Sequence, residues 1–441
     1  MNLLQRIAEF VHGALPPTNH GRLEAGFVDA CVALMAGARS PEGRALLTLA
    51  AQTEAERAGL ATAIIRSTEV DDIHLASCTT PSSVAVAVAL CDGRPGDPQT
   101  VVSAVSVGIE LMIRLGLAID GPNALYRGIW PTCFAAPLGA AATRARLRGL
   151  TVDQTMHALS LALMASSGRI GRFAGTPSGR WVLIKTAVAN GVQAADAAGV
   201  GFKGDPTLLD ADWLGTAQGI GADLSKIADK LGEVSMAGAL SMKPFSTARQ
   251  ALAPTTALQT LLANGLDPAS IRRIQVSVPS AYSRMISQPI TPSRSSGYVS
   301  AAFQMALAAL RPQALWDLER SSVMTDPAIL DFAGRITVAA EPAFDAIYPR
   351  HWPARIAVET AGRILVHEEE VALGDPDRPL SDTDLVAKHR HLLSFAYAGK
   401  AEALRVQMAD ALQSTAALAA TKKRLHEALK KTGNEGEKNA H

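Results

Sequence analysis

The spacing of apolar residues changes at about residue 265, and this change constrains the fold more than any other feature. Before it, apolar side chains recur at helical spacing in Ala-rich segments such as "SAVSVGIELMIRLGLAI". After it, "IRRIQVSVP" alternates apolar and polar side chains, as a strand with one buried face does. The chain is therefore predicted to be mainly α, with a large all-helical domain and a smaller α+β domain.

Three segments make up this predicted architecture. Residues 1–266 form the first part of the helical domain, residues 267–385 form an inserted α+β lid, and residues 386–441 return to the helical domain. Within the lid, "RITVAAEP" and "ARIAVETAGRILVHEEEVAL" also alternate, and "SAAFQMALAALRP" predicts one clear helix between the strands. Gly362 interrupts the last strand segment as the turn of a hairpin would. The final residues, "TGNEGEKNAH", are predicted to be a frayed tail.

Charge and cysteine content narrow the classes of function. The 42 Lys and Arg residues balance 41 Asp and Glu residues, so no excess charge favours binding to nucleic acid or a membrane. The four cysteines have neither zinc-site spacing nor the density of a disulfide framework, which favours a reducing compartment and a cytoplasmic protein. The N-terminus reads as an amphipathic helix, and no apolar run approaches the roughly 20 residues that span a bilayer.

Two segments contain histidine close to other possible metal ligands. "HEEE" lies in a predicted strand and "HRH" in a predicted helix, and neither spacing brings ligands to one point. Both are interpreted as solvated charged surface. No metal site and no cofactor are predicted.

Five stretches in order carry a family resemblance: "DDIHLASCTTPSSV", "GIWPTCFAAPLGAA", "GRWVLIKTAVANGVQAADAAGVGF", "SMKPFSTARQA" and "VALGDPDRPLSDTDLVAKHR". Together they resemble the MmgE/PrpD family, which includes methylcitrate dehydratases, cis-aconitate decarboxylases and an iminodisuccinate epimerase. The resemblance spans most of the chain. It implies a helical domain, an α+β lid, a cofactor-free site between them and a homodimer.

The chain departs from the family pattern at two histidines. Thr80 precedes Pro81 where the family usually has His-Pro, and Trp130 opens "WPT" where it has His-Pro-Thr. Thr80 and its neighbour Thr79 donate hydrogen bonds but are not bases at neutral pH. Trp130, with Thr132 beside it, supplies an apolar face and one N–H donor, either to the pocket or to the core. These four residues are expected to bind substrate.

The cations of the pattern are partly kept. Arg180 aligns with a family lysine, Lys243 is retained with its following proline, and Arg249 follows at the usual distance. The planar fork of arginine grips a carboxylate with two hydrogen bonds, so these three residues are expected to bind substrate carboxylates. Lys185 replaces a usual glycine inside an apolar helix. It either extends to solvent or has a lowered pKa and acts as a base.

The remaining acid and base candidates lie in the first motif. Asp71 and Asp72 are adjacent, so at most one side chain is expected to face the pocket. His74 is the nearest imidazole and has a suitable pKa for a base, although a structural role is equally open. In the lid, Tyr298 is a candidate phenol donor.

These residues predict a cofactor-free lyase or isomerase that acts on a small carboxylate-bearing molecule. The chemistry is removal of a proton next to a carboxylate or carbonyl, followed by dehydration, decarboxylation, epimerisation or cyclisation. The missing histidines predict a substrate other than methylcitrate or cis-aconitate. The alternative is a catalytically inactive binding or scaffold homologue.

Overall fold

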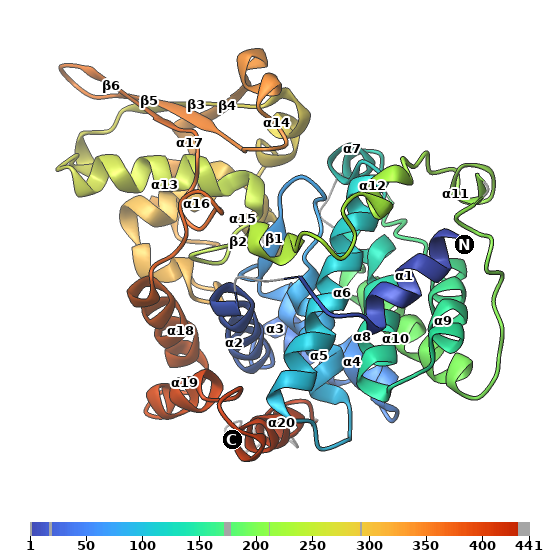
Figure 1. Ribbon diagram of the computed structural model, residues 1–441. Coiled ribbons are helices and arrows are strands. Elements are labelled where there is room, and N and C mark those ends of the chain that lie inside the picture. The colour runs from blue at the N-terminus through green and yellow to red at the C-terminus, as the bar shows by residue number, and fades with distance from the viewer. Residues whose placement is uncertain (1, 17–19, 172–177, 211, 292, 431–441) are drawn as a thin grey trace.

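The computed structural model describes residues 2–16, 20–171, 178–210, 212–291 and 293–430. A large helical body adjoins a smaller part built around a four-stranded sheet (Figure 1), which confirms the predicted fold class. The predicted frayed tail lies outside the described residues. The helices of the body are α1 (Leu3–His12), α2 (His20–Gly37), α3 (Pro41–Leu47), α4 (Glu54–Ser67), α5 (Pro81–Cys91), α6 (Pro98–Ala118), α7 (Gly121–Tyr126), α8 (Pro131–Arg148), α9 (Val152–Met164), α10 (Arg180–Gly199), α11 (Trp213–Thr216), α12 (Ser225–Ala228), α18 (Asp382–Ala396), α19 (Ala401–Ala409) and α20 (Thr415–Ala428).

Small residues let the central helices of the body pack closely. Helix α6 contacts α5 and α8, and α10 contacts α4, α8 and α9. Where α4 meets α10, a Cβ added at Gly59 would lie 2.1 Å from the carbonyl oxygen of Lys185. Only a glycine permits this approach of the two backbones.

Helix α6 corrects one expectation from the sequence. Among the described residues it is the one helix long and apolar enough to cross a membrane by length and composition. In the structure 83% of its most apolar window is buried inside the protein. Its apolar surface is therefore covered by α5 and α8, as in the central helix of a globular core.

The lid sheet has the strand order β4–β3–β5–β6. β3 runs parallel to β4 and antiparallel to β5, and β5 and β6 form the predicted hairpin around Gly362. The alternation read in the sequence matches the structure, because every second residue of β3 is buried. The strands are β3 (Arg273–Val278), β4 (Ile336–Ala340), β5 (Ala354–Glu359) and β6 (Ile364–Glu369).

Between β3 and β5 the lid is more helical than the sequence indicated. The described residues of this region form four α-helices. The sequence predicted only one of them, because the other three are six to eight residues long and too short for a helical period to be recognised. They are α14 (Ser280–Ile286), α15 (Arg294–Val299), α16 (Ala301–Leu310) and α17 (Pro327–Gly334).

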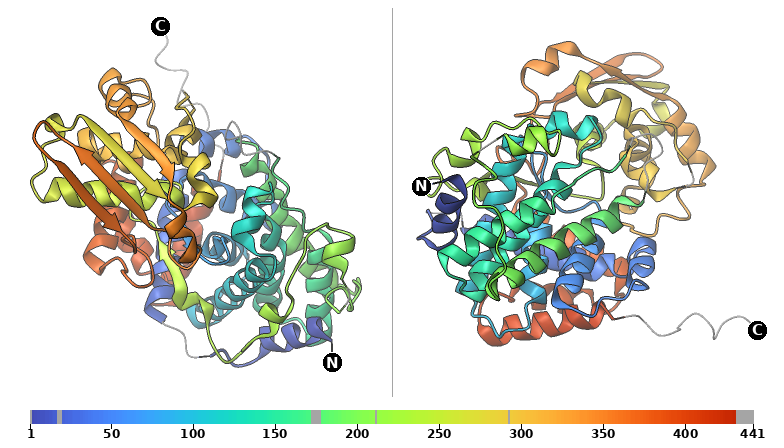
Figure 2. Two further views of the ribbon diagram at one scale, coloured as in Figure 1. Left: turned by 90° about the horizontal axis from the view of Figure 1, so that it is seen from above. Right: turned by 90° about the vertical axis from the view of Figure 1, so that its right-hand side faces the viewer.

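Helix α13 (Arg249–Ala263) lies beneath the sheet, where it contacts β5, β6 and α16 (Figure 1). Its contacts join it to the lid, although it precedes residue 267, and the division of the chain at that residue stays a prediction. After the sheet, α18, α19 and α20 pack against α2, and α20 also contacts α5 (Figures 1 and 2). The chain thus returns to the helical body.

A second, two-stranded sheet lies where the lid meets the body. β1 (Asp72–His74) pairs antiparallel with β2 (Leu240–Met242), with Asp72 opposite Met242. The sequence interpretation expected extended or turn backbone at the first segment but did not predict the pairing, since three-residue strands leave no readable alternation. This pairing brings the residues just before β1 beside those just after β2.

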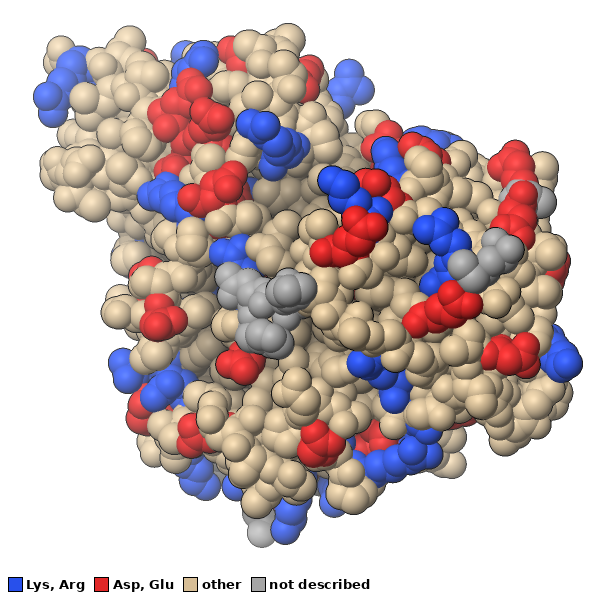
Figure 3. All heavy atoms as spheres, viewed as in Figure 1, with Lys and Arg blue, Asp and Glu red and all other residues tan. Residues whose placement is uncertain are grey.

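The visible surface carries no large region of one charge. In Figure 3, Lys and Arg are interspersed with Asp and Glu over the face shown. This distribution agrees with the balanced composition.

Candidate active site

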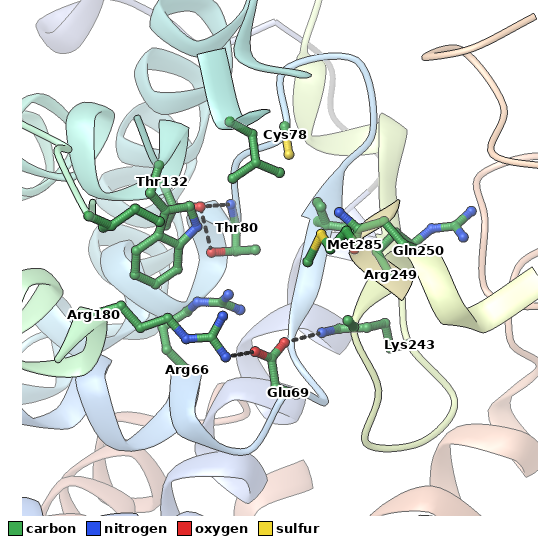
Figure 4. A pocket seen from close by; sticks show the side chains of 15 residues that line it. Arg66, Glu69, Cys78, Thr80, Thr132, Arg180, Lys243, Arg249, Gln250 and Met285 are labelled. Carbon is green, nitrogen blue, oxygen red and sulfur yellow. Dashed lines mark hydrogen bonds and ion pairs between the residues drawn. The ribbon is translucent and has the colours of Figure 1, made fainter. Parts of the chain in front are cut away.

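A pocket opens where the body, the lid and the two-stranded sheet meet (Figure 4). Its empty volume, including its open mouth, is about 560 Å³. The residues that line it come from α4, β1, α7, α8, α10, α13 and α14 and from the segments next to these elements. The lining residues are Arg66, Glu69, Ile73, Cys78, Thr80, Leu125, Trp130, Thr132, Ile170, Arg180, Lys243, Ala248, Arg249, Gln250 and Met285.

Three helices of the body begin at this pocket, as does α13, whose first residue is Arg249. Thr80 precedes α5, Trp130 precedes α8, and Arg180 is the first residue of α10. Proline follows both Thr80 and Trp130, and its fixed φ and missing N–H suit the first helical position. The N-terminus of a helix carries partial positive charge and free N–H groups, so the three helix starts favour an anionic ligand.

Two hydroxyl groups stand where the family resemblance led us to expect histidine and threonine. Thr80 Oγ1 lies 3.2 Å from Thr132 Oγ1, which also accepts the Thr80 backbone N–H at 3.2 Å. Both side chains line the pocket. They join the starts of α5 and α8 and present hydrogen-bonding groups without a titratable proton at neutral pH.

Cations and carboxylates alternate along the pocket floor. Glu69 accepts from Arg180 Nη2 at 2.9 Å, and its other oxygen lies 3.4 Å from Lys243 Nζ (Figure 4). Asp71, behind the lining, pairs with Arg66 and lies 3.5 Å from Lys243 Nζ. Three cations thus face two carboxylates inside the protein.

Burial and pairing oppose each other in this cluster. Burial lowers the pKa of Lys243, although Asp71 and Glu69 counteract it. Burial also lowers the pKa of Arg180 against the effect of Glu69. For Glu69, burial would raise the pKa, but Lys243, Arg180 and Arg66 together lower it below the usual value. Each charge is therefore maintained by its partners.

Trp130 lines the pocket, which is one of the two placements, pocket or core, that the sequence left open. Its ring packs edge-on against Trp181, with the centroids 5.9 Å apart. The guanidinium of Arg66 lies over the Trp130 ring, 5.2 Å from its centroid. The tryptophan thus supplies an apolar wall and holds one of the cations in place.

Four candidates of the first motif, the two aspartates with His74 and Thr79, do not line the pocket. His74 and Thr79 face each other across an isolated bridge, and the Ser77 backbone N–H donates to His74 Nδ1 at 3.2 Å. Burial lowers the pKa of His74 to about 4. The ring is therefore neutral at pH 7 and a weak base, which favours the structural reading of this histidine.

Asp72 lies behind the pocket at the start of α5. Its Oδ2 accepts the Ser82 backbone N–H at 3.3 Å, and its Oδ1 has no hydrogen-bond partner among the described residues. Burial, and then the charge of Asp71, raise the pKa of Asp72 to about 7. Neither Asp71 nor Asp72 lines the pocket, whereas the sequence interpretation treated both as catalytic candidates and expected one at most to face it.

We expect the Asp72→Asn variant to be more stable than wild type at alkaline pH. Folding raises the pKa of Asp72, so the protonated carboxyl favours the folded state. This contribution to stability is complete below about pH 4 and is lost as the pH rises through about 7. Asparagine stays neutral and still accepts from Ser82. Between pH 5 and pH 8 the difference in unfolding free energy should shift by about 3 kcal/mol in favour of the variant. Urea unfolding at both pH values measures it, and identical pH dependence of the two proteins would show that Asp72 titrates normally.

Three further candidates lie outside the pocket or turn away from it. Arg249 is a lining residue, but its Nη2 donates to both carboxylate oxygens of Asp375 in the lid, at 2.6 and 2.8 Å. Tyr298 is buried in the lid with the Arg320 guanidinium 4.2 Å from its ring centroid. Lys185 is half-buried on α10 beside α4 and is absent from the lining.

The sequence interpretation missed two charged residues of the pocket, Arg66 and Glu69. Arg66 lies in the last turn of α4 and Glu69 follows the helix, so both read as the polar end of a helix. The one available signal was that Glu69 lies two residues before the paired aspartates that open the first motif. Gln250 and Met285 were also missed; Gln250 Nε2 donates to the hydroxyl of Tyr126 at 3.2 Å.

The described residues contain no cluster of three or more His, Cys, Asp or Glu side chains that could hold a metal ion. The "HRH" segment is solvated surface only in part, because Arg390 is exposed but His389 is buried. Lys388 and His389 are both buried on α18 and both contact Asp29 of α2. In the "HEEE" segment, Glu369 is buried and pairs with Arg378.

A helical body, an α+β lid and a cation-lined pocket between them define the class of protein. The MmgE/PrpD N-terminal domain model matches residues 5–225 and the MmgE/PrpD C-terminal domain model matches residues 245–414. The chain belongs to the MmgE/PrpD family.

Curated relatives are cis-aconitate decarboxylases of Aspergillus terreus. One is 26% identical over 361 residues, which cover 75% of this chain and 72% of the relative. Another, from strain NIH 2624 / FGSC A1156, is 36% identical over 115 residues, which cover 24% of this chain and 23% of the relative. The family and the first of these relatives support a lyase-type activity on carboxylate substrates.

Proposed function

We propose that this protein is a cofactor-free lyase or isomerase that removes a proton next to a carboxylate or carbonyl of a small carboxylate-bearing substrate. The observation that carries the proposal is the convergence of Arg180 and Lys243 on one point of the pocket, where both contact Glu69. A substrate carboxylate at that point would receive charge-assisted hydrogen bonds from both. Fold analogy adds to this argument.

The pocket supplies what proton abstraction beside a carboxylate requires. When the proton leaves, negative charge moves onto the carboxylate oxygens, and fixed cations lower the energy of that state. Lys243 is buried beside Asp71, and the half-buried guanidinium of Arg180 lies over the Trp181 ring, so both need little reorganisation as the charge develops. The hydroxyls of Thr80 and Thr132 offer donors to a leaving or neighbouring oxygen.

We further propose that the substrate differs from methylcitrate and cis-aconitate. The pocket has Thr80 and Trp130 in place of two family histidines. Its wall also contains apolar side chains on several sides, namely Ile73, Leu125, Ile170 and Met285. This wall suits a substrate with fewer carboxylates and an apolar group.

The experiment is a substrate panel in D₂O followed by proton NMR. The panel contains malonate, L-malate, phenylacetate, cis-aconitate and 2-methylcitrate, with and without a metal chelator. We expect chelator-insensitive deuterium incorporation beside a carboxylate, or product formation, with one of the first three compounds. Efficient turnover of cis-aconitate or 2-methylcitrate would contradict the altered substrate, and loss of activity with chelator would contradict a cofactor-free mechanism.

The alternative is an inactive carboxylate-binding or scaffold homologue. The described lining residues favour it in one respect, because they include no imidazole. It predicts binding of carboxylates without deuterium exchange. A cytoplasmic homodimer remains our expectation from the sequence and the family resemblance, and size-exclusion chromatography tests the dimer.

A further inference from the structure

Glu69 lines the pocket and pairs with both of the cations that are proposed to bind the substrate. Its side chain is 7% exposed and spans the gap between Arg180 on the helical body and Lys243 beside β2 (Figure 4). Its backbone has φ +55°, in the left-handed region, and its carbonyl accepts the Thr247 N–H at 3.1 Å. The hydrogen bond from Thr247 holds the backbone of Glu69 in this sparsely populated conformation and so fixes the position from which the carboxylate extends.

The two cations depend on Glu69 to different degrees. Among the described residues, Glu69 is the one carboxylate paired with Arg180. Lys243 has other partners, since its Nζ donates to the Thr247 carbonyl at 3.1 Å and lies 3.5 Å from Asp71. An incoming carboxylate that replaced Glu69 on Arg180 would therefore leave Lys243 and its surroundings in place.

We propose that Glu69 is an internal anion that occupies the seat of the substrate carboxylate and, once displaced, acts as the general base. This inference rests on the proposed function and names the residue that replaces the missing histidines. The displaced carboxylate stays in the pocket, because its backbone is fixed by Thr247, and so remains close to the substrate that displaced it.

Electrostatics make the displaced carboxylate a better base than the paired one. In the free protein Lys243, Arg180 and Arg66 lower the pKa of Glu69 against the opposing effect of burial. A substrate carboxylate shares these cations and adds a negative charge nearby, while Glu69 stays buried. Both changes raise the affinity of Glu69 for a proton. The base is thus activated by the substrate itself.

The step balances with groups that are present. Glu69 Oε takes the proton from the carbon beside the substrate carboxylate, and the electron pair of the C–H bond moves into that carboxylate to give an enediolate. Arg180 and Lys243 stabilise the enediolate oxygens. The pair then returns to carbon as a proton is delivered there, or expels a leaving group from the adjacent carbon.

Glu69→Gln tests both parts of the proposal, with Glu368→Gln as the matched control on an exposed ion pair of the lid. Binding of malonate, L-malate and phenylacetate is measured by calorimetry, and deuterium exchange of the same compounds by NMR. Because glutamine is neutral and no longer competes for the cations, we expect it to bind at least as tightly as wild type. Loss of the base should lower exchange by about 100-fold or more.

A third variant, Glu69→Asp, keeps the charge but is one methylene shorter. We expect it to recover part of the exchange that Glu69→Gln loses, and to bind no more tightly than wild type. Recovery of exchange would distinguish a base from a residue that only fills space. The Glu69→Asp variant also keeps the base role testable if Glu69→Gln folds poorly. Failure of a well-folded Glu69→Asp to exchange at all would overturn the base role.

Other outcomes would also overturn the inference. Exchange by Glu69→Gln within about tenfold of wild type would show that another group is the base. Weaker binding by Glu69→Gln than by the control would show that Glu69 does not compete with the ligand. If wild type exchanges none of the three compounds, the proposed function and the base role both fall, while tighter binding by Glu69→Gln would still support the internal anion.

Discussion

Replacing Lys388 by Met is expected to lower the free energy of unfolding by about 3–5 kcal/mol. Lys388 Nζ lies 2.7 Å from Asp29 Oδ1, and it donates to Asp29 Oδ2 and to the Val70 carbonyl, both at 2.9 Å. Lysine and aspartate are both buried. Methionine fills a similar volume but leaves the Asp29 charge with His389 as its remaining partner.

Lys423→Met, an exposed lysine on α20, is the matched control, and its unfolding free energy should change little. The double variant Asp29→Asn with Lys388→Met should recover part of the loss, because no unpaired charge then remains. Urea unfolding measures all three. A Lys388→Met protein as stable as the control would show that this pair does not hold α18 to α2.

The same contact reaches the candidate site. Val70 lies between Glu69 and Asp71, the two carboxylates that pair with the pocket cations. Lys388 binds the Val70 carbonyl, so α18 near the end of the chain supports the segment that carries both. The return of the C-terminal helices to the body therefore contributes to the geometry of the pocket.

The sequence was sufficient for elements with a clear period. The alternation in residues 273–278 and 354–369 predicted β3 and the β5–β6 hairpin, because one face of each is buried more than the other. The short strands β1 and β2 were not predictable, since their pairing joins segments about 170 residues apart and all six residues are buried. His389 of the "HRH" segment was wrongly interpreted as solvated surface, because its partner Asp29 is 360 residues away in the chain.

The candidate site was predictable to a similar extent. Proline after Thr80 and after Trp130 marked helix starts, and the family pattern pointed to Arg180 and Lys243; all four residues line the pocket. Glu69 could not be recognised, because its partners are 111 and 174 residues away in the chain. Tertiary contacts alone distinguish this carboxylate from an exposed one.

Arg180→Ala is expected to weaken binding of a small carboxylate about tenfold or more. The substitution removes a charge-assisted contact worth on the order of 1.5–3 kcal/mol. Arg180 is a better choice than Lys243, because Lys243 also contacts Asp71 and the Thr247 carbonyl and its loss would disturb the packing around them. The guanidinium of Arg180 lies 4.1 Å from the Trp181 ring centroid and binds Glu69.

Lys185→Ala is the matched control, because Lys185 lies on the same helix but outside the pocket lining. It removes the same charge from α10 without touching the proposed seat. This comparison also tests whether Lys185 is a base, as one reading of the sequence held. Because Lys185 does not line the pocket, we expect Lys185→Ala to leave ligand affinity and deuterium exchange unchanged.

The affinity of malonate for wild type, Arg180→Ala and Lys185→Ala, measured by calorimetry at one ionic strength, tests the central claim most directly. That claim is that the pocket between body and lid binds a carboxylate through Arg180 and Lys243. We predict binding by wild type and Lys185→Ala with equal affinity, and binding about tenfold or more weaker by Arg180→Ala. Equal affinity of all three proteins, or a loss confined to Lys185→Ala, would contradict it.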